Sequence, residues 1–308
     1  MNFDHETTKI DFIKHRKKFF IFSGVMVILG VLLLSTVGLN LGIDFRSGTT
    51  IDVLSDEELT EEAVTAEFET IGIIPDDVIL AGANNEIGRA SFIGNLEQQE
   101  TLEVQSHFED VYGHTPTVST VTPMVGEELA RNAIISVLIA TVGIIIYVTI
   151  RFELLYGISA IVALFHDALF ILFVFSILQF EVNIPFIAAV LTIVGYSIND
   201  TIVTFDRIRE NMKLEKKVKK FDDLARVVNK SLVQTLARSI NTVLTVVFAA
   251  GALWIFGGDA IQTFAFALVV GLVAGTYSSL FLASQLWLVM KAKQLERKKQ
   301  RPVQQSEA

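Results

Sequence analysis

The chain has 308 residues, of which 51% are hydrophobic and only 19% are charged, and its mean hydropathy is +0.51. These values exclude an ordinary soluble domain of this size and predict that lipid surrounds much of the chain. Cysteine is absent, which excludes a disulfide framework and a thiolate metal site. The net charge of −9 argues against nucleic acid as a partner and leaves membrane lipid as the expected surroundings.

Six charge-poor windows are long enough to cross a bilayer, whose hydrocarbon core of about 30 Å requires about 20 apolar residues per helix. The first window follows a basic cluster and lacks a small-residue cleavage pattern, so we expect an uncleaved anchor and not a signal peptide. In chain order, the predicted transmembrane helices cover residues 19–38, 132–150, 154–178, 184–205, 236–257 and 261–290.

Lysine and arginine gather on one side of these windows, and the positive-inside rule makes that side the cytoplasm. Both termini are then predicted to be cytoplasmic, as expected for a multi-pass membrane protein. The segment 39–131 falls outside, with 19 acidic residues against 3 arginines. The predicted organisation is a cytoplasmic N-terminus at 1–18, the first helix at 19–38, the external domain at 39–131, helices two to six at 132–290 with a cytoplasmic loop at 207–235, and a basic tail at 291–308.

The external segment has the pattern of a small α+β domain. Strand-like runs and amphipathic helical runs alternate in the order strand, helix, strand, strand, helix, strand, which is the order of the ferredoxin-like fold. The predicted fold class is therefore an α-helical polytopic membrane protein of six transmembrane helices with an extracytoplasmic ferredoxin-like domain. The elements are expected at residues 48–54, 60–72, 77–82, 89–94, 97–113 and 117–121.

The fourth window contains polar residues at helical spacing. Ionisable groups at membrane depth cost about 2.5–3.5 kcal/mol or more unless they are paired or hydrated, which makes each one a functional candidate. Asp200 can either bind and release a proton or hold a neighbouring helix permanently, and spacing does not separate these alternatives. Ser197 and Thr204 are expected on the same stripe as Asp200, with Gly195 and Asn199 beside it.

The fifth window opens with a second polar stripe, formed by Arg238, Asn241 and Thr242. Because this helix starts from the same side at which the fourth helix ends, Arg238 can reach the depth of Asp200. Such a pair is able to act as a switch, since a nearby guanidinium favours the ionised carboxylate. The alternative is an arginine that extends to the cytoplasmic interface.

Two further features lie in the third and sixth windows. Asp167, beside His166, can extend a proton relay or bond a serine or threonine of a neighbouring helix. Gly271 and Gly275 have the spacing of small residues that permits close helix packing, and Gly195 is a third candidate for such packing.

Several motifs together resemble those of SecF, the bacterial protein-export membrane protein. The resemblance covers nearly the whole length, and its most specific part is GYSINDTIVTFDRIREN in the fourth window. Other matching segments are GIDFRSGT at 42–49, the His–Asp pair of the third window, LARSINT at 236–242 and FGG at 256–258. The family usually has glycine where this chain has Ser47. The family-motif turn comprises Gly42, Asp44, Phe45, Arg46 and Gly48.

The resemblance implies one six-helix half of an RND-like transporter that is completed by a SecD-like subunit and works with the SecYEG channel and the SecA motor. It implies that the proton motive force helps to release translocating preproteins on the outer side. Asp200 and Arg238 match the intramembrane residues that the family implicates. No catalytic residue, metal or cofactor is implied, so we expect a transport protein and not an enzyme.

Three other functions are compatible with parts of the pattern. A small-molecule exporter made of two copies would use the same helices, and a passive scaffold of the translocon would need no proton coupling. An intramembrane aspartyl protease using Asp167 and Asp200 is disfavoured, because the residues before Asp200 do not form the usual Gly-x-Gly-Asp signature.

Overall fold

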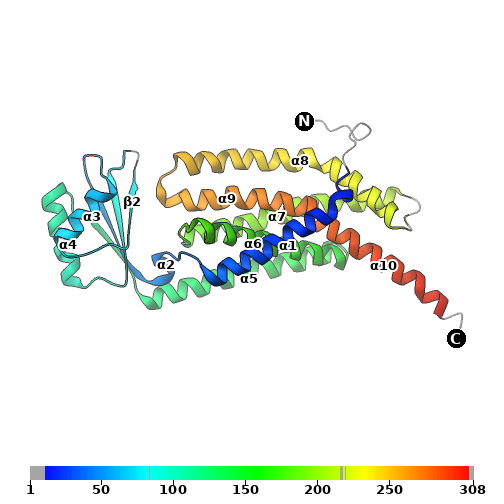
Figure 1. The fold of residues 1–308 in the computed structure, drawn as a ribbon, viewed down its shortest axis with the longest axis horizontal. Helices are drawn as coiled ribbons and strands as arrows, with labels where there is room; N and C mark the ends of the chain where they lie inside the picture. Colours follow the sequence, from blue (N-terminus) through cyan, green and yellow to red (C-terminus); the bar gives the residue numbers. More distant parts are fainter. Residues whose placement is uncertain (1–10, 83, 216–217, 219, 305–308) are drawn as a thin grey trace.

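The computed structural model describes residues 11–82, 84–215, 218 and 220–304. A long helical bundle carries a small α+β domain at one end, and helix α1 begins and helix α10 ends toward the opposite end (Figure 1). The parts of the predicted terminal segments at 1–10 and 305–308, and positions 216, 217 and 219 of the predicted loop, lie outside the described residues.

Six helical segments of the described chain are long and apolar enough to cross a membrane, which confirms the predicted number. The last span is interrupted by a π-helical turn, η2, which separates α9 from α10. The spans are built from α1 (Arg16–Thr36), α5 (Pro123–Arg151), α6 (Leu154–Leu178), α7 (Ile184–Leu214), α8 (Phe221–Phe256), and α9 (Asp259–Tyr277) with η2 (Ser278–Ala283) and α10 (Ser284–Gln304).

Helix ends differ from the sequence prediction mainly where helices continue beyond the apolar windows. The segment predicted as a loop at 207–235 is largely helical, because α7 runs to Leu214 and α8 begins at Phe221. Polar residues stabilise this extension: Asn211 donates to Ser231 at 2.8 Å and to Gln234 at 2.8 Å, joining the two helices. Hydropathy identifies the apolar part of a helix and not its water-exposed continuation, which explains the difference.

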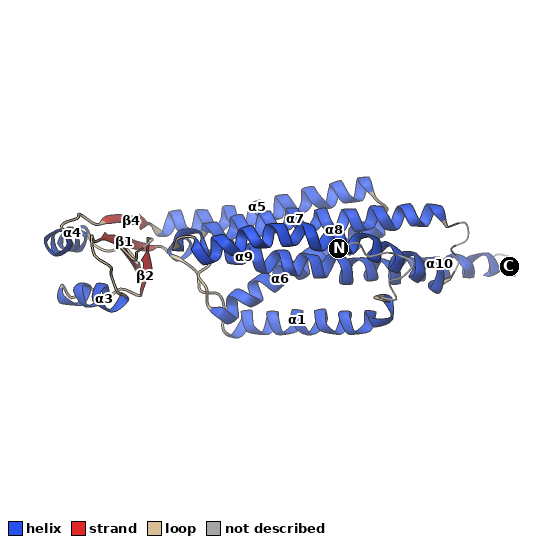
Figure 2. Cartoon of the chain, turned by 90° about the horizontal axis from the view of Figure 1, so that it is seen from above, coloured by secondary structure: helices blue, strands red, loops and turns tan. Residues whose placement is uncertain are grey.

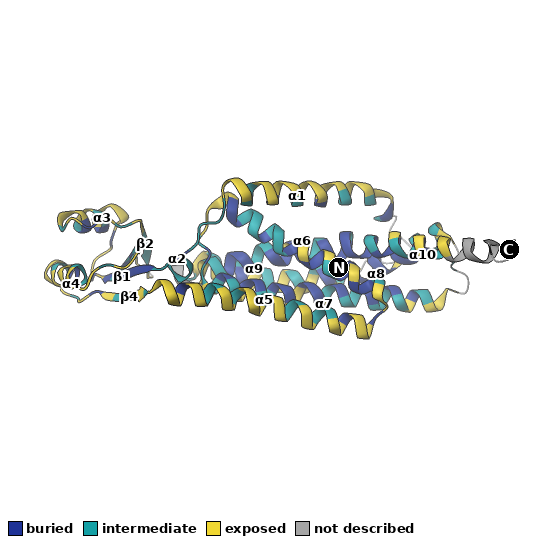
Figure 3. Cartoon of the chain, turned by 90° about the horizontal axis from the view of Figure 1, so that it is seen from below, coloured by how far each residue is buried: buried dark blue, intermediate teal, exposed yellow. Residues whose placement is uncertain are grey.

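The helices differ in how much of their surface the chain itself covers. α6, α7 and α9 form the packed centre, whereas α1 packs along α6 at the edge (Figure 2). Much of the surface of α1, α5 and α8 is exposed (Figure 3). Large apolar side chains on these three helices, such as Ile28, Ile139 and Phe248, are 66%, 68% and 72% exposed. These faces suit lipid or another membrane subunit.

The external domain is ferredoxin-like, as predicted. Its four antiparallel strands have the order β2-β3-β1-β4, and α3 and α4 cover one sheet face around Phe68 and Phe108, which are fully buried. Thr60 caps α3 by accepting a hydrogen bond from the Ala63 N–H at 3.2 Å. The elements are β1 (Gly48–Leu54), α3 (Glu61–Thr70), β2 (Asp77–Ala81), β3 (Ile87–Ile93), α4 (Gln98–Tyr112) and β4 (Thr117–Val121).

A short helix, α2 (Ile43–Arg46), links α1 to the first strand and packs against α5. It contains most of the family-motif turn. Ser47 follows it with φ 62° and ψ 144°, a conformation that glycine adopts freely and that costs other residues about 1–3 kcal/mol. The glycine usual in the family at this position therefore suits the backbone better than serine does.

Candidate functional site

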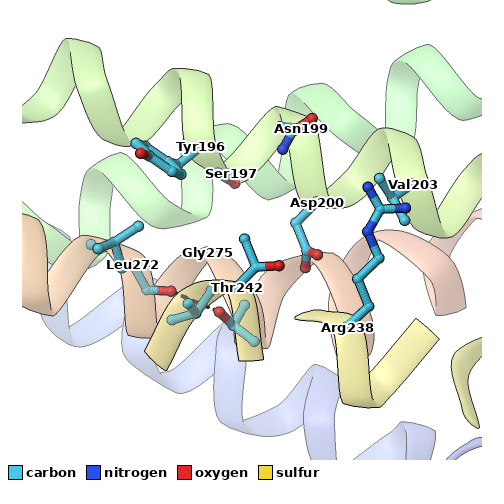
Figure 4. A pocket seen from close by; sticks show the side chains of 12 residues that line it. Tyr196, Ser197, Asn199, Asp200, Val203, Arg238, Thr242, Leu272 and Gly275 are labelled. Atoms are coloured by element: carbon cyan, nitrogen blue, oxygen red, sulfur yellow. Dashed lines mark hydrogen bonds between the residues drawn. The ribbon is translucent and has the colours of Figure 1, made fainter. Parts of the chain in front are cut away.

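The candidate site lies between α7, α8 and α9, where a small cavity of about 40 Å³ has room for about one to three water molecules. Asn183 caps the N-terminus of α7 by accepting from the Phe186 N–H at 3.1 Å, and the helix then runs unbroken to Asp200 and beyond. Figure 4 shows the Asp200 carboxylate pointing from α7 toward α8. Polar or charged residues around this cavity are Ser197, Asn199, Asp200, Arg238, Thr242 and Thr276.

Only one of the two carboxylate oxygens of Asp200 has a hydrogen-bond partner among the described residues. Its Oδ1 accepts a hydrogen bond of 2.5 Å from the Ser239 hydroxyl, while its Oδ2 is buried and has no hydrogen-bond partner among the described residues. An unpaired carboxylate oxygen in a low-dielectric site is costly when ionised, and a proton, a water molecule or a moving cation removes that cost. The site therefore has the chemistry of a carboxylate that can change its protonation.

Arg238 lines the same cavity from α8, and Figure 4 shows its side chain extending beside Asp200 toward α7. Within the described residues the two form no ion pair; Arg238 itself is exposed. Asp200 and Arg238 thus line one cavity without direct pairing. A small shift of α8 against α7 would change their separation, and with it the charge that the carboxylate experiences.

Asp167 has a different environment. It is 2% exposed, and its Oδ2 accepts from the hydroxyls of Ser197 at 2.6 Å and Ser278 at 2.7 Å. Its Oδ1 lies 3.2 Å from His166 Nδ1. The carboxylate therefore joins α6, α7 and η2, which is the bonded alternative that the sequence left open.

The π-helical turn η2 brings two consecutive serines to this junction. Ser278 bonds Asp167, and the Ser279 hydroxyl lies 2.7 Å from that of Thr201 on α7. A regular α-helix separates consecutive side chains by about 100°, and local widening of the helix is a common adjustment at polar sites. The sequence left open a serine or threonine partner for Asp167 but did not identify Ser278 or Ser279.

The packing glycines have distinct surroundings. A Cβ at Gly271 would overlap the side chain of Ile193, and one at Gly275 would lie 3.1 Å from the Cβ of Ser197. These two residues therefore permit the close approach of α9 to α7. The packing expected for Gly195 is not observed, because this residue is exposed and a Cβ there would meet nothing within 4 Å. It does not pack against another helix of this chain.

Two other polar residues of the expected stripes lie away from the cavity. Thr204 is fully buried, its hydroxyl has no partner among the described residues, and it does not line the cavity; Val203 does. Asn241 is exposed on α8. The sequence pattern did not identify Ser239 as a site residue. Ser239 follows Arg238 on α8, and its hydroxyl donates to Asp200 on α7.

Comparison with known proteins agrees with this architecture. Residues 103–293 match the family model "Protein export membrane protein SecD/SecF, C-terminal", and residues 32–58 match "SecD/SecF GG Motif". The chain is 53% identical over 289 residues to protein translocase subunit SecDF of Bacillus subtilis (strain 168), which covers 94% of this chain and 39% of that protein. It is 41% identical over 295 residues to protein translocase subunit SecF of Alicyclobacillus acidocaldarius, which covers 94% and 95%, respectively.

A solved structure is also similar. The crystal structure of SecDF, a translocon-associated membrane protein from Thermus thermophilus, superposes with a TM-score of 0.80 at 33% identity. The match covers 92% of this chain and 39% of that one, so the chain spans less than half of the SecDF proteins and nearly all of the SecF relative. The chain therefore belongs to the SecD/SecF family of protein-export membrane proteins, as a multi-pass subunit of the protein translocase.

Proposed function

We propose that this chain, together with a SecD-like subunit, uses the proton motive force to promote the export of preproteins across the bacterial cytoplasmic membrane. In this proposal it works beside the SecYEG channel and the SecA motor, and both of its termini are cytoplasmic. Reversible protonation of Asp200 couples proton movement to a rearrangement of α7 and α8, and Arg238 adjusts the charge that the carboxylate experiences.

The observation that carries the proposal is the half-satisfied state of Asp200. One oxygen is bonded to Ser239, and the other faces no donor among the described residues, beside a cavity of about 40 Å³ that Arg238 also lines. A carboxylate with a fixed structural role is normally bonded through both oxygens, as Asp167 is. Asp200 is therefore the better candidate for a group that gains and loses a proton.

A membrane partner is supported by the surface next to this cavity. Asn199, Arg238, Asn241 and Thr242 are exposed on α7 and α8, among apolar side chains that face outward. Polar groups directed at lipid are costly, and a second set of helices would cover them. A SecD-like subunit packed here would enclose the cavity and separate Arg238 from lipid.

The test is preprotein release from spheroplasts at fixed ATP, with the membrane potential maintained or collapsed, in cells that contain or lack this chain. The proposal predicts that the chain accelerates release only when the gradient is present. Equal acceleration without the gradient would leave a passive scaffold as the better description, and no effect on export in either condition would contradict both.

The proposed orientation has its own test because the chain contains no cysteine. Single cysteines at Glu97, which precedes α4, and at Glu210, near the end of α7, should react with impermeant reagents from opposite sides of the membrane. Reaction from the same side would contradict the proposed topology.

A further inference from the structure

A second polar region lies outside the membrane-spanning helices, between the external domain and the bundle. α3 and α4 cover one face of the sheet, and the opposite face is directed toward the bundle (Figures 1 and 2). A cavity of about 710 Å³ separates this face from the outer ends of the helices. Its charged lining residues are Asp44, Arg46, Asp52, Asp76, Asp77, Arg89 and Glu181.

Few backbone contacts tie the two parts together at this cavity. The Gly42 N–H donates to the Val182 carbonyl at 2.9 Å, and the Val182 N–H donates to the Asn40 carbonyl at 2.8 Å. The Asp44 carboxylate accepts from the Ile184 N–H at 2.9 Å. The loop between α6 and α7, together with the packing of α2 against α5, thus holds the segment that leads into the external domain.

Glu181 lies in this loop, and its carboxylate fills the space beside Gly42. A Cβ at Gly42 would overlap that carboxylate. The backbone of Gly42 has φ −69° and ψ 172°, which every residue adopts easily, so conformational freedom does not explain the glycine. The first glycine of the family-motif turn instead provides the room in which the Glu181 carboxylate rests.

The charges around Glu181 are mostly of its own sign. Burial raises the pKa of Glu181 above its usual value of 4.5, and Asp44 on α2 and Asp77 on β2 raise it further. Arg89 on β3 and the backbone N–H of Ile43 act in the opposite direction. Arg89 is also engaged by Asp52 on β1 through two hydrogen bonds of 2.7 and 2.8 Å, which divides its charge between the carboxylates.

The remaining charged groups of the cavity leave the net charge around Glu181 negative. Asp76 accepts a hydrogen bond from the Ile93 N–H. Arg46, the last residue of α2, lines the same cavity. Five carboxylates thus share the cavity with two arginines. Docking of the external domain brings the carboxylates of two separate parts of the molecule together, which is unfavourable while all of them are ionised.

We propose that Glu181 is a proton-binding site on the outer side of the protein that holds the external domain against the bundle when it is protonated and loosens that contact when it is ionised. The docked arrangement leaves Glu181 only partly exposed and places it near Asp44 and Asp77, so the neutral carboxyl is favoured over the charged one. Undocking restores water around the carboxylate and separates it from Asp77.

The sign of the pH dependence follows from this arrangement. Because the pKa of Glu181 is raised in the docked arrangement and returns toward 4.5 when the contact opens, protonation stabilises docking. This stabilisation is complete below the ordinary value of 4.5 and is lost as the pH rises through the raised value. The site is separate from Asp200, and only its assignment to the outer face rests on the proposed orientation.

The experiment measures the distance between the two parts of the full-length protein in lipid nanodiscs, where both sides of the bilayer have the same pH. Spin labels on cysteines at Leu102 in α4 and Phe256 at the end of α8, which are 59% and 86% exposed, report the separation by pulsed electron resonance. The parent protein should show one narrow distance distribution in acid and a broader, longer one at higher pH, with a midpoint above 4.5.

Three variants test the assignment. Glu181→Gln, which is isosteric with the protonated side chain, should keep the acid distribution at every pH. Gly42→Ala should displace the flexible Glu181 side chain and abolish the pH dependence, and Asp77→Asn should move the midpoint to lower pH by removing a neighbouring negative charge. Glu62→Gln, on the exposed surface of α3, is the matched control and should behave like the parent.

A Glu181→Gln protein that retains the parent's pH-dependent change would overturn the proposal, as would a parent protein with one unchanging distribution over the whole range. Neither result bears on Asp200, since the measurement needs no export and no proton gradient. Failure here and failure of proton-coupled export are therefore distinguishable.

Discussion

Two carboxylates in the same bundle have opposite environments. Asp167 is bonded through both oxygens by groups of three helical segments, whereas Asp200 is bonded through one oxygen and directs the other toward a small cavity. A carboxylate bonded through both oxygens helps to fix the packing of its helices, whereas one with an unpaired buried oxygen is stabilised by a proton or a new donor. The contrast is the reason why we propose that Asp200, and not Asp167, responds to protons.

The largest expected effect is that of Asp200→Asn, which removes the titratable group and keeps the shape of the side chain. Gradient-dependent stimulation of preprotein release should be abolished, while membrane insertion and partner assembly stay intact. Asp206→Asn is the control, because Asp206 lies toward the end of α7 in ion pairs with Arg209 and Arg151, at 2.6 and 3.9 Å. It should have a milder effect if depth in the membrane matters.

Arg238 should tolerate only a change that keeps its charge. Arg238→Met removes the cation beside Asp200 and should be inactive, whereas Arg238→Lys keeps the charge, loses the planar guanidinium and should be partly active. The readout is the same gradient-dependent release. Full activity of Arg238→Met would exclude a role for this cation in coupling.

Substitution of Asp167 should mainly lower the stability of the protein. Asp167→Ala leaves the Ser197 hydroxyl without its acceptor, leaves Ser278 with only the Gly275 carbonyl at 3.2 Å, and should lower the free energy of unfolding by about 1–3 kcal/mol. Thermal unfolding of the purified protein in detergent measures this change. Asp200→Ala, with a single side-chain hydrogen bond to lose, should be destabilised less, and equal losses would contradict the contrast between the two sites.

The smallest effects should come from the serines that bond each carboxylate. Ser278→Ala removes one of two hydroxyls on Asp167 and should cost about 0.6–1.7 kcal/mol of stability, with gradient-dependent release unchanged. Ser239→Ala removes the only side-chain donor that Asp200 has among the described residues and should change gradient-dependent release. An unaltered gradient response in Ser239→Ala would mean that this bond does not influence coupling.

The sequence was sufficient for the architecture because hydropathy and residue periodicity act locally. Six apolar windows and the ferredoxin-like order of elements are confirmed, and both signals are readable within about 20 residues. The helical extension of α7 beyond residue 205 was not predicted, because polar helices at a membrane surface resemble loops in a hydropathy profile.

Details of the site depended on contacts between distant segments. Spacing indicated that Asp200 and Arg238 reach one depth but did not identify Ser239 as the donor to Asp200. The packing role expected for Gly195 is not seen among the described residues, where a Cβ at this position would meet nothing within 4 Å. The π-helical turn that directs Ser278 toward Asp167 has no clear local signature.

The most direct test of the central claim is the infrared difference spectrum of the lipid-embedded protein, together with its SecD-like partner, between low and high pH. We predict a protonated-carboxyl band that disappears in Asp200→Asn and remains in Asp167→Asn. A band that survives in Asp200→Asn, or one that is lost only in Asp167→Asn, would contradict the assignment of proton coupling to Asp200.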